Sequence, residues 1–329
     1  MEYAPAPWLP GPHAMTLYGA LLRPFPRPRF RRERWELADG DFLDVDRLEG
    51  PSEGAPVLVV CHGLEGSSRA PYVRGLAARA RAAGLAVAAP NFRGCSGAEN
   101  RLPRFYHSGE TSDLAEVVAR LCAERPGRAL VLAGFSLGGN VVVKYLGERG
   151  GRVPEEVKGA AVVSVPFDLA ACARALDGPG GWVRLYRGRF LRSLRAKAMR
   201  KERRFPGLLD RAAVAASRTF AAFDAAVTAP LHGFPSAEDY WARSSSGPFL
   251  PGVGRPLLAV SALDDPLVPA ESLPLAAARE NPLVSLLATP KGGHVGFVAG
   301  TPAAPHFFAE ERAAAFLSQL AAGPGGGAP

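Results

Sequence analysis

The segment from Leu130 to Asn140 constrains this chain more than any other, because its pattern requires an abrupt change of secondary structure. Residues 130–133 are all apolar, a run too short for a helix and too hydrophobic for a surface loop. A central strand buried on both faces accounts for it. From 141 onward, apolar residues return at spacings that one helical face can bury. The segment therefore predicts a strand, a sharp turn and a helix, with Ser136 in the turn.

Glycines surround this serine, at 134, 138 and 139. Neighbours without side chains leave a serine hydroxyl clear above the sheet, and the first N–H groups of the following helix face the same point. Such a turn is typical of a nucleophile whose oxyanion is stabilised by backbone N–H groups. Because the chain holds 37 glycines, the spacing alone is weak evidence, and a tight structural turn is the alternative. The predicted strand and helix on either side favour a nucleophilic Ser136.

Short apolar runs alternate with helical patterns along much of the chain, which indicates βαβ units and a mostly parallel sheet flanked by helices. In such sheets, the catalytic and ligand-binding residues lie at the carboxyl ends of the strands. Alternating patterns on either side of Asp39-Gly40 predict a hairpin. The predicted strands are 57–60, 85–89, 130–133, 160–165, 256–262 and 283–288, and the predicted helices are 71–83, 112–124 and 307–320.

Changes in composition divide the chain into four parts. A proline-rich start, 1–30, reads as an arm along the surface, and a Gly/Pro/Ala-rich tail, 323–329, is expected to be disordered. The strand and helix pattern covers 31–165 and 255–322, which we expect to form one α/β core. Between these stretches, 166–254 lacks the strand pattern and is predicted to be an inserted helical cap.

The charge and cysteine content narrow the classes of function. The net charge is +8, but only five of the 39 basic residues are Lys and no nucleic-acid-binding motif is visible, so we expect no nucleic-acid partner. Four scattered cysteines, no secretory signal and no long apolar segment predict a cytoplasmic protein with reduced thiols. Basic residues gather at 184–204, which is interpreted either as a cap helix with one solvated face or as a surface for anionic membranes or acidic partners.

Two further groups could activate Ser136. A serine needs a base, and the base needs an acid that fixes its tautomer. His294 lies among glycines after the last predicted strand and is the candidate base. Asp264 and Asp265 both follow the strand 256–262. Asp265 is favoured because it lies further past the strand and directly before a proline, which fixes the backbone of the loop, whereas Asp264 would then hydrogen-bond within the loop.

An oxyanion hole requires two N–H donors. One is expected from Leu137, directly after the nucleophile, and the other from Leu64, which follows the strand 57–60 in the sequence His62-Gly-Leu64. His62 itself is interpreted as a structural hydrogen-bonding residue rather than as a proton carrier.

The motifs of this chain resemble those of the α/β-hydrolase superfamily. Within it, they closely resemble the motifs of the YheT-like esterases, which are related to ABHD-type hydrolases and to yeast medium-chain acyltransferases. The matching segments span most of the chain and are His62–Gly66, Asn91–Gly97, Tyr106–Thr111, Gly134–Asn140, Asp264–Pro266 and Gly292–Phe297. The resemblance implies Ser136 as the nucleophile, Asp265 as the orienting acid and His294 as the base, and it implies ester hydrolysis without a cofactor. The scattered cysteines lead us to expect no metal site.

The sequence therefore predicts a serine carboxylesterase that acts through an acyl-enzyme on short- to medium-chain esters. One alternative is acyl transfer to an alcohol with the same three residues, if the cap excludes water. The other is a hydrolase fold without catalysis that binds a partner or a lipid surface through its basic cap.

Overall fold

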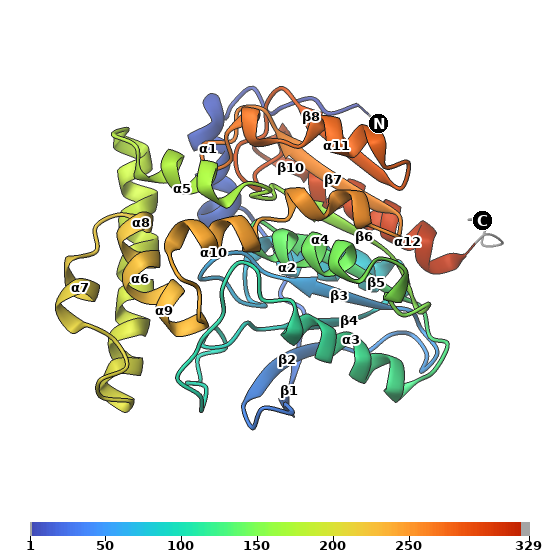
Figure 1. The fold of residues 1–329 in the computed structure, drawn as a ribbon. Coiled ribbons are helices and arrows are strands. Elements are labelled where there is room, and N and C mark those ends of the chain that lie inside the picture. The colour runs from blue at the N-terminus through green and yellow to red at the C-terminus, as the bar shows by residue number, and fades with distance from the viewer. Residues whose placement is uncertain (1, 324–329) are drawn as a thin grey trace.

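The centre of the molecule is a single sheet of eight strands, in the order β1-β2-β4-β3-β5-β6-β7-β8 (Figure 1). The computed structural model describes residues 2–323, so the predicted tail, except for its first residue, lies outside the described residues. Strand β2 pairs antiparallel with β1 and β4, and every other pairing in this sheet is parallel. The strands are β1 (Arg31–Glu36), β2 (Phe42–Leu48), β3 (Val57–Cys61), β4 (Ala86–Pro90), β5 (Leu130–Phe135), β6 (Val157–Val163), β7 (Leu257–Ala262) and β8 (Val284–Thr289).

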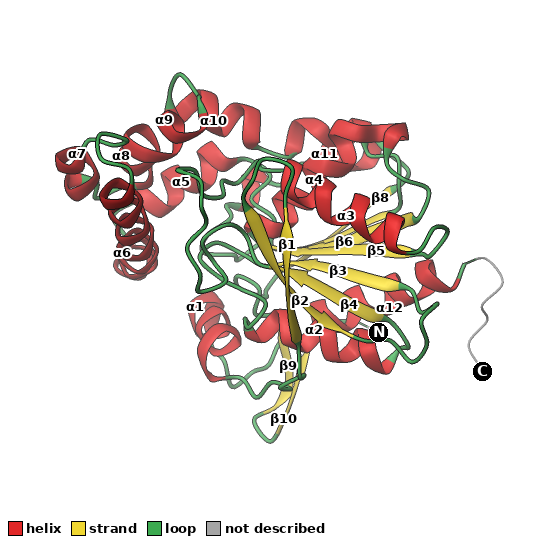
Figure 2. Ribbon diagram, turned by 90° about the horizontal axis from the view of Figure 1, so that it is seen from below, coloured by secondary structure: helices red, strands yellow, loops and turns green. Residues whose placement is uncertain are grey.

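Helices cover both faces of this sheet, as the sequence pattern predicts. Figure 2 shows α3, α4 and α11 on one face, with α2 and α12 on the other. Successive residues of β3 enter two separate cores: Val57 and Val59 pack on the α3 and α4 side, and Leu58 and Val60 pack on the α2 and α12 side. The helices of the core are α2 (Pro71–Ala82), α3 (Ser112–Glu124), α4 (Leu137–Arg149), α11 (Leu275–Glu280) and α12 (Phe308–Ala322), with the short 3₁₀ turns η2 (Gly150–Arg152) and η5 (Ala270–Ser272).

The residues of the predicted cap form helices between β6 and β7, and Figure 1 shows most of them beside the core, at the carboxyl ends of the strands. The last of them, η4, instead packs on α4 within the core layer. This close approach depends on Gly147, where a Cβ atom would lie 2.1 Å from the carbonyl oxygen of Phe249. The elements are α5 (Leu169–Asp177), α6 (Gly181–Arg204), α7 (Arg211–Ala216), α8 (Phe220–Phe223), the π-helical turn η3 (Asp224–Thr228), α9 (Ala229–His232), α10 (Ala237–Ser244) and η4 (Gly247–Gly252).

The amino-terminal arm contains the helix α1 (Gly11–Leu17) and a π-helical turn, η1 (Tyr18–Leu22), which the sequence pattern did not predict. The arm packs closely on the body of the protein. Tyr3 stacks on Phe308 with 4.7 Å between ring centroids, and the guanidinium of Arg23 forms a buried ion pair with Glu310. Within residues 2–323, no helix combines the length and the apolar character that a membrane span requires.

Most predicted strands and helices agree with the structure to within one or two residues, but two regions besides the arm differ. Strand β6 was predicted at 160–165 and occupies Val157–Val163, because Ser164 has a φ of +53° that ends the strand, while Lys158 and Gly159 interrupt its apolar pattern. The hairpin of β9 (Val298–Thr301) and β10 (Ala304–Phe307) was not predicted, since its strands are short and largely exposed.

Candidate active site

Ser136 occupies a strained turn between β5 and α4. Its φ of 52° and ψ of −123° lie in a region that non-glycine residues rarely adopt. Larger residues would not fit in place of the glycines around Ser136. A Cβ at Gly134 would lie 2.4 Å from the carbonyl oxygen of Gly138, and a Cβ at Gly138 would lie 2.4 Å from the carbonyl oxygen of His62. The backbone therefore holds the serine hydroxyl at the carboxyl end of β5, in front of the first turn of α4.

The structure brings together the three side chains that the sequence singled out. The Oγ of Ser136 lies 2.9 Å from Nε2 of His294, and Nδ1 of His294 lies 2.8 Å from Oδ2 of Asp265. The backbone N–H groups of Leu267 and Val268 donate to the other carboxylate oxygen of Asp265. Because the carboxylate accepts the proton of Nδ1, the lone pair of Nε2 faces the serine hydroxyl.

The neighbouring acid has a different position. Oδ1 of Asp264 accepts a hydrogen bond of 2.9 Å from the backbone N–H of Gly293, and within residues 2–323 the imidazole forms its ion pair with Asp265 rather than with Asp264. The two consecutive aspartates therefore hold the histidine loop in two ways, one through the ring and one through the backbone.

Two residues that sequence reasoning missed hold the same loop. The backbone N–H of His294 donates to Oγ1 of Thr16 over 2.8 Å, and that of Val295 donates to Oγ of Ser164 over 3.0 Å. The N–H groups of 293, 294 and 295 are thus each bound by a side chain from a different part of the chain. Ser164 directly follows β6, so its position after a buried strand was a usable signal, whereas no spacing in the arm marks Thr16.

The predicted oxyanion donors lie beside the nucleophile. Leu64 and Leu137 line one cavity together with Ser136 and His294. Leu137 is the first residue of α4, where N–H groups have no partner within the helix, and in residues 2–323 no hydrogen bond uses the N–H of Leu64. This pair is therefore available to an oxygen next to Ser136.

His62 supports the loop that carries Leu64. Its Nε2 accepts the N–H of Phe92 over 3.1 Å, so the proton lies on Nδ1 and donates to the carbonyl of Gly63 over 2.8 Å. Burial lowers the pKa of His62 to about 4, which keeps the ring neutral. The predicted structural role agrees with this geometry.

A buried ion pair joins the same loop to the cap. Nζ of Lys197, on α6, contacts a carboxylate oxygen of Glu65, and both side chains are less than one tenth exposed. Although burial acts to raise it, the pKa of Glu65 is lowered by the ammonium of Lys197 and by hydrogen bonds from Ser193 and Tyr106. The carboxylate therefore stays ionised and ties α6 to the residues next to Leu64.

Ser136 and His294 lie where two cavities meet. The first cavity extends beneath the cap and is lined mainly by apolar side chains. The second is an open groove of about 470 Å³ between the arm, α6 and the loop before α2. The apolar lining of the first cavity includes Leu169, Cys172, Leu176, Leu194, Phe220 and Phe223.

Comparison with known proteins agrees with this architecture. A family model described as alpha/beta hydrolase fold matches residues 56–301. The Escherichia coli protein YheT, whose name describes it as a candidate esterase, is 36% identical over 94% of this chain and 91% of its own length. Phospholipase ABHD3 of Mus musculus is 28% identical over 91% of this chain and 74% of its own length.

Among solved structures, the esterase Pf2001 of Pyrococcus furiosus has the same fold. Its TM-score is 0.54 at 17% identity, over 84% of this chain and 90% of that one. The matched family model and the similarity to YheT extend over most of the sequence, and the sheet and its flanking helices are those of the same fold. This chain belongs to the α/β-hydrolase fold family.

Proposed function

We propose that the protein is a serine carboxylesterase that forms an acyl-enzyme on Ser136. The observation that carries this proposal is the continuous chain of contacts from the serine hydroxyl through His294 to Asp265. A relay of this kind turns a weak nucleophile into an effective one at neutral pH. Relatives named as a candidate esterase and a phospholipase are consistent with ester chemistry.

In the first half of the reaction, Oγ of Ser136 attacks the ester carbonyl carbon while its proton passes to Nε2 of His294. The tetrahedral intermediate carries its negative charge on the former carbonyl oxygen, which the N–H groups of Leu64 and Leu137 stabilise. Asp265 stabilises the imidazolium through Nδ1. When the intermediate collapses, the carbon–oxygen bond to the alcohol breaks, and His294 returns the proton to the departing alcohol.

In the second half, His294 takes a proton from water, and the resulting hydroxide attacks the acyl-enzyme. This attack gives a second tetrahedral intermediate, and when it collapses the bond between the acyl carbon and Oγ of Ser136 breaks, His294 returns its proton to Oγ, and the carboxylic acid leaves. The groove beside the serine is lined in part by polar side chains such as those of Ser67 and Arg69, so water can reach the acyl-enzyme from this side. We therefore place hydrolysis ahead of acyl transfer.

The cavity beneath the cap suits the acyl chain of the substrate. Leu and Phe are the most frequent residues in its lining, and apolar surface of this kind binds methylene groups. The proposed substrates are short- to medium-chain esters, with the acyl chain beneath the cap and the alcohol in the open groove.

Hydrolysis and labelling assays on the purified protein test the proposed esterase function directly. Ser136→Ala should lose nearly all hydrolysis of p-nitrophenyl butyrate and octanoate, and it should no longer be labelled by a fluorophosphonate. Ser108→Ala, which changes another serine lining the cavity, should still be labelled. Retained turnover in Ser136→Ala would reject the assignment. Adding ethanol and measuring ethyl ester against free acid separates hydrolysis from transfer.

A further inference from the structure

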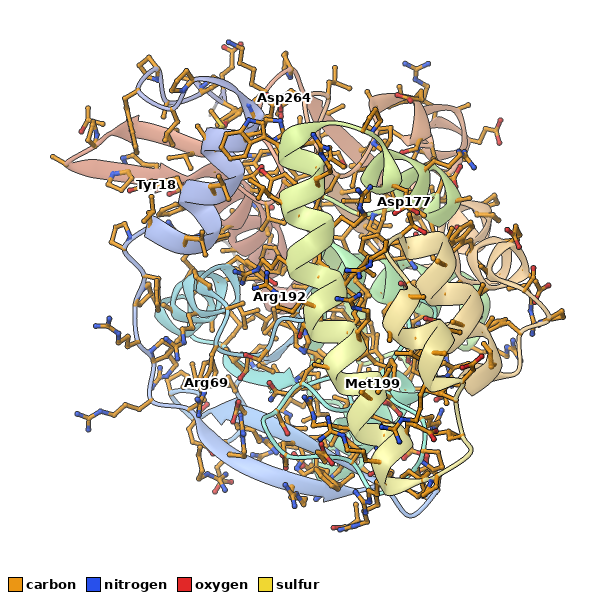
Figure 3. The ribbon with its side chains drawn as sticks, turned by 90° about the vertical axis from the view of Figure 1, so that its left-hand side faces the viewer. Tyr18, Arg69, Asp177, Arg192, Met199 and Asp264 are labelled. Carbon is orange, nitrogen blue, oxygen red and sulfur yellow. The ribbon has the colours of Figure 1, made fainter. Side chains whose placement is uncertain are left out.

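Several of the largest exposed apolar side chains of the described residues gather on one face of the molecule. Leu21 and Leu22, at the end of η1, are 57% and 73% exposed, and Trp182 and Leu185, at the start of α6, are 49% and 64% exposed. The arm and α6 lie side by side, because the ring of His13 stacks on Trp182 with 5.3 Å between centroids. Figure 3 looks onto this face, with α6 across the front and the arm next to it.

The groove that reaches Ser136 opens between these two apolar groups. Leu21 lines one wall of the groove and Arg189 of α6 lines another, while Arg69 lies in the loop before α2. Because Ser136 and His294 lie at its inner end, any ester that enters here arrives at the candidate nucleophile. Leu21 itself lines the groove, and Leu22 and Leu185 directly follow and precede the lining residues Leu21 and Tyr186, so exposed apolar side chains lie on both elements that border it.

Cations without partners border the same surface. Arg189 and Arg192 follow Leu185 by four and seven residues, so they share its face of α6. Neither these two guanidinium groups nor that of Arg69 has a carboxylate within 4 Å in the described part of the chain. Figure 3 shows Arg69 and Arg192 on the face that carries the groove. Unpaired positive charge is thus concentrated here.

Other cations of α6 have different surroundings. Lys197 pairs with Glu65, Lys201 donates to the carbonyls of Asn100 and Leu102, and Arg200 pairs with Glu99. Part of the positive charge of 184–204 is therefore bound by other groups of the protein. Arg189 and Arg192 are not bound in this way by a carboxylate in the described residues.

The groove offers almost no negative charge to balance these cations. The only carboxylate that lines it within the described residues is Glu65, which Lys197 already neutralises. Nearby, burial and the charges of Arg69 and Arg27 lower the pKa of Arg74. Repulsion among these guanidinium groups would be relieved by an anion at the surface.

Exposed leucines and a tryptophan beside unpaired arginines have the chemistry of an interface between water and lipid. We propose that this docking face, formed by Leu21, Leu22, Arg69, Trp182, Leu185, Arg189 and Arg192, binds the surface of an anionic lipid bilayer. The leucines and Trp182 enter the acyl region, and the arginines bind lipid phosphates. Delivery of an ester from the bilayer to Ser136 through the groove rests on the proposed function, whereas binding to the bilayer does not.

Co-sedimentation of the full chain with vesicles tests the proposal. The protein should bind vesicles of equal parts phosphatidylglycerol and phosphatidylcholine, bind pure phosphatidylcholine much more weakly, and lose affinity as salt is added. Leu22→Ser/Leu185→Ser should lower the affinity by about tenfold or more, because two largely exposed leucines no longer enter the bilayer. Arg69→Gln/Arg192→Gln should lower it by about fivefold for each charge removed.

Matched controls come from another part of the surface. Leu275 and Leu283 are each 40% exposed and lie at α11 and just before β8, away from α6 in Figure 1. Leu275→Ser/Leu283→Ser should bind anionic vesicles as the unaltered protein does. Leu22→Ser/Leu185→Ser should hydrolyse soluble p-nitrophenyl butyrate at the unaltered rate, which shows that it is folded.

The outcomes separate the two proposals. Ser136→Ala should bind vesicles normally, so a failure of catalysis leaves the docking proposal standing. Absence of binding to anionic vesicles, or equal losses in the docking-face and control variants, would overturn it. Binding to an acidic polymer such as polyglutamate but not to vesicles would assign the face to an acidic protein instead and would also overturn it.

Discussion

The hydroxyl of Thr16 gives the sharpest test of how the candidate site is held together. It accepts the N–H of His294 over 2.8 Å and donates to the carbonyl of Pro12 over 2.7 Å, and the residue is 7% exposed. Thr16→Val keeps the shape and removes both hydrogen bonds. A buried N–H without an acceptor costs roughly 1–3 kcal/mol. If the loop moves to recover a partner, the ratio of molecules with His294 in place to molecules with the loop displaced falls by roughly 5- to 150-fold.

The expected result is a measurable fall in kcat on p-nitrophenyl butyrate, at most of that size, with little change in KM, because Thr16 acts through the position of His294. Thr16→Ser keeps the hydroxyl and should restore most of the activity. Thr111→Val is the matched control, since it removes the hydrogen bond from a partly buried threonine to Glu148. It should change the free energy of unfolding without changing kcat. A normal kcat in Thr16→Val would refute this account of the loop.

Three further predictions follow from the site. Asp265→Asn should lower kcat by ~10⁴-fold because the amide no longer fixes the tautomer of His294, whereas Asp264→Asn keeps an acceptor for Gly293 and should cost less than about tenfold; kinetics on one ester compare them. Because burial lowers the pKa of His62 from 6.5 to about 4, the unfolded state gains a proton first as pH falls. Stability should therefore decrease between these two pH values by up to about 3 kcal/mol, measured by urea unfolding, and His62→Gln should flatten the slope. Ala173→Leu, in the apolar cavity, should lower kcat/KM for octanoate more than for butyrate; an unchanged ratio would place the acyl chain elsewhere.

Much of the fold could be predicted because its strands are short apolar runs that end in glycine, proline or polar residues. Such runs leave no alternative to burial in a sheet covered on both faces. The arm helix α1 could not be predicted, since its residues pack on the histidine loop and α6 rather than forming a periodic apolar face. The hairpin of β9 and β10 could not be predicted, because strands of four largely exposed residues show no clear alternation of apolar and polar residues.

The side chains of the candidate relay were found because each follows a buried strand, where parallel sheets gather polar residues. The contacts that hold them were harder to find. Ser164 was hidden because the predicted strand ends at 165, two residues past the observed end of β6, and Thr16 bonds a residue 278 positions away. The Glu65 and Lys197 pair had one signal. That signal is the rarity of lysine in this arginine-rich chain. Three of the five lysines are buried, namely Lys144, Lys197 and Lys201, so a lysine within the run of arginines indicated a buried contact better than the arginines did.

The three anchors of the histidine loop also bear on how the protein is made. A ribosome synthesises Thr16 first, Ser136 and Ser164 midway and His294 near the end, so the serine emerges 158 residues before its imidazole partner. A nascent chain would therefore contain the proposed nucleophile before the residue that is proposed to activate it. Under the proposed function, reactivity towards esters would arise only after β8 has joined the sheet and the histidine loop that follows it has reached Ser136.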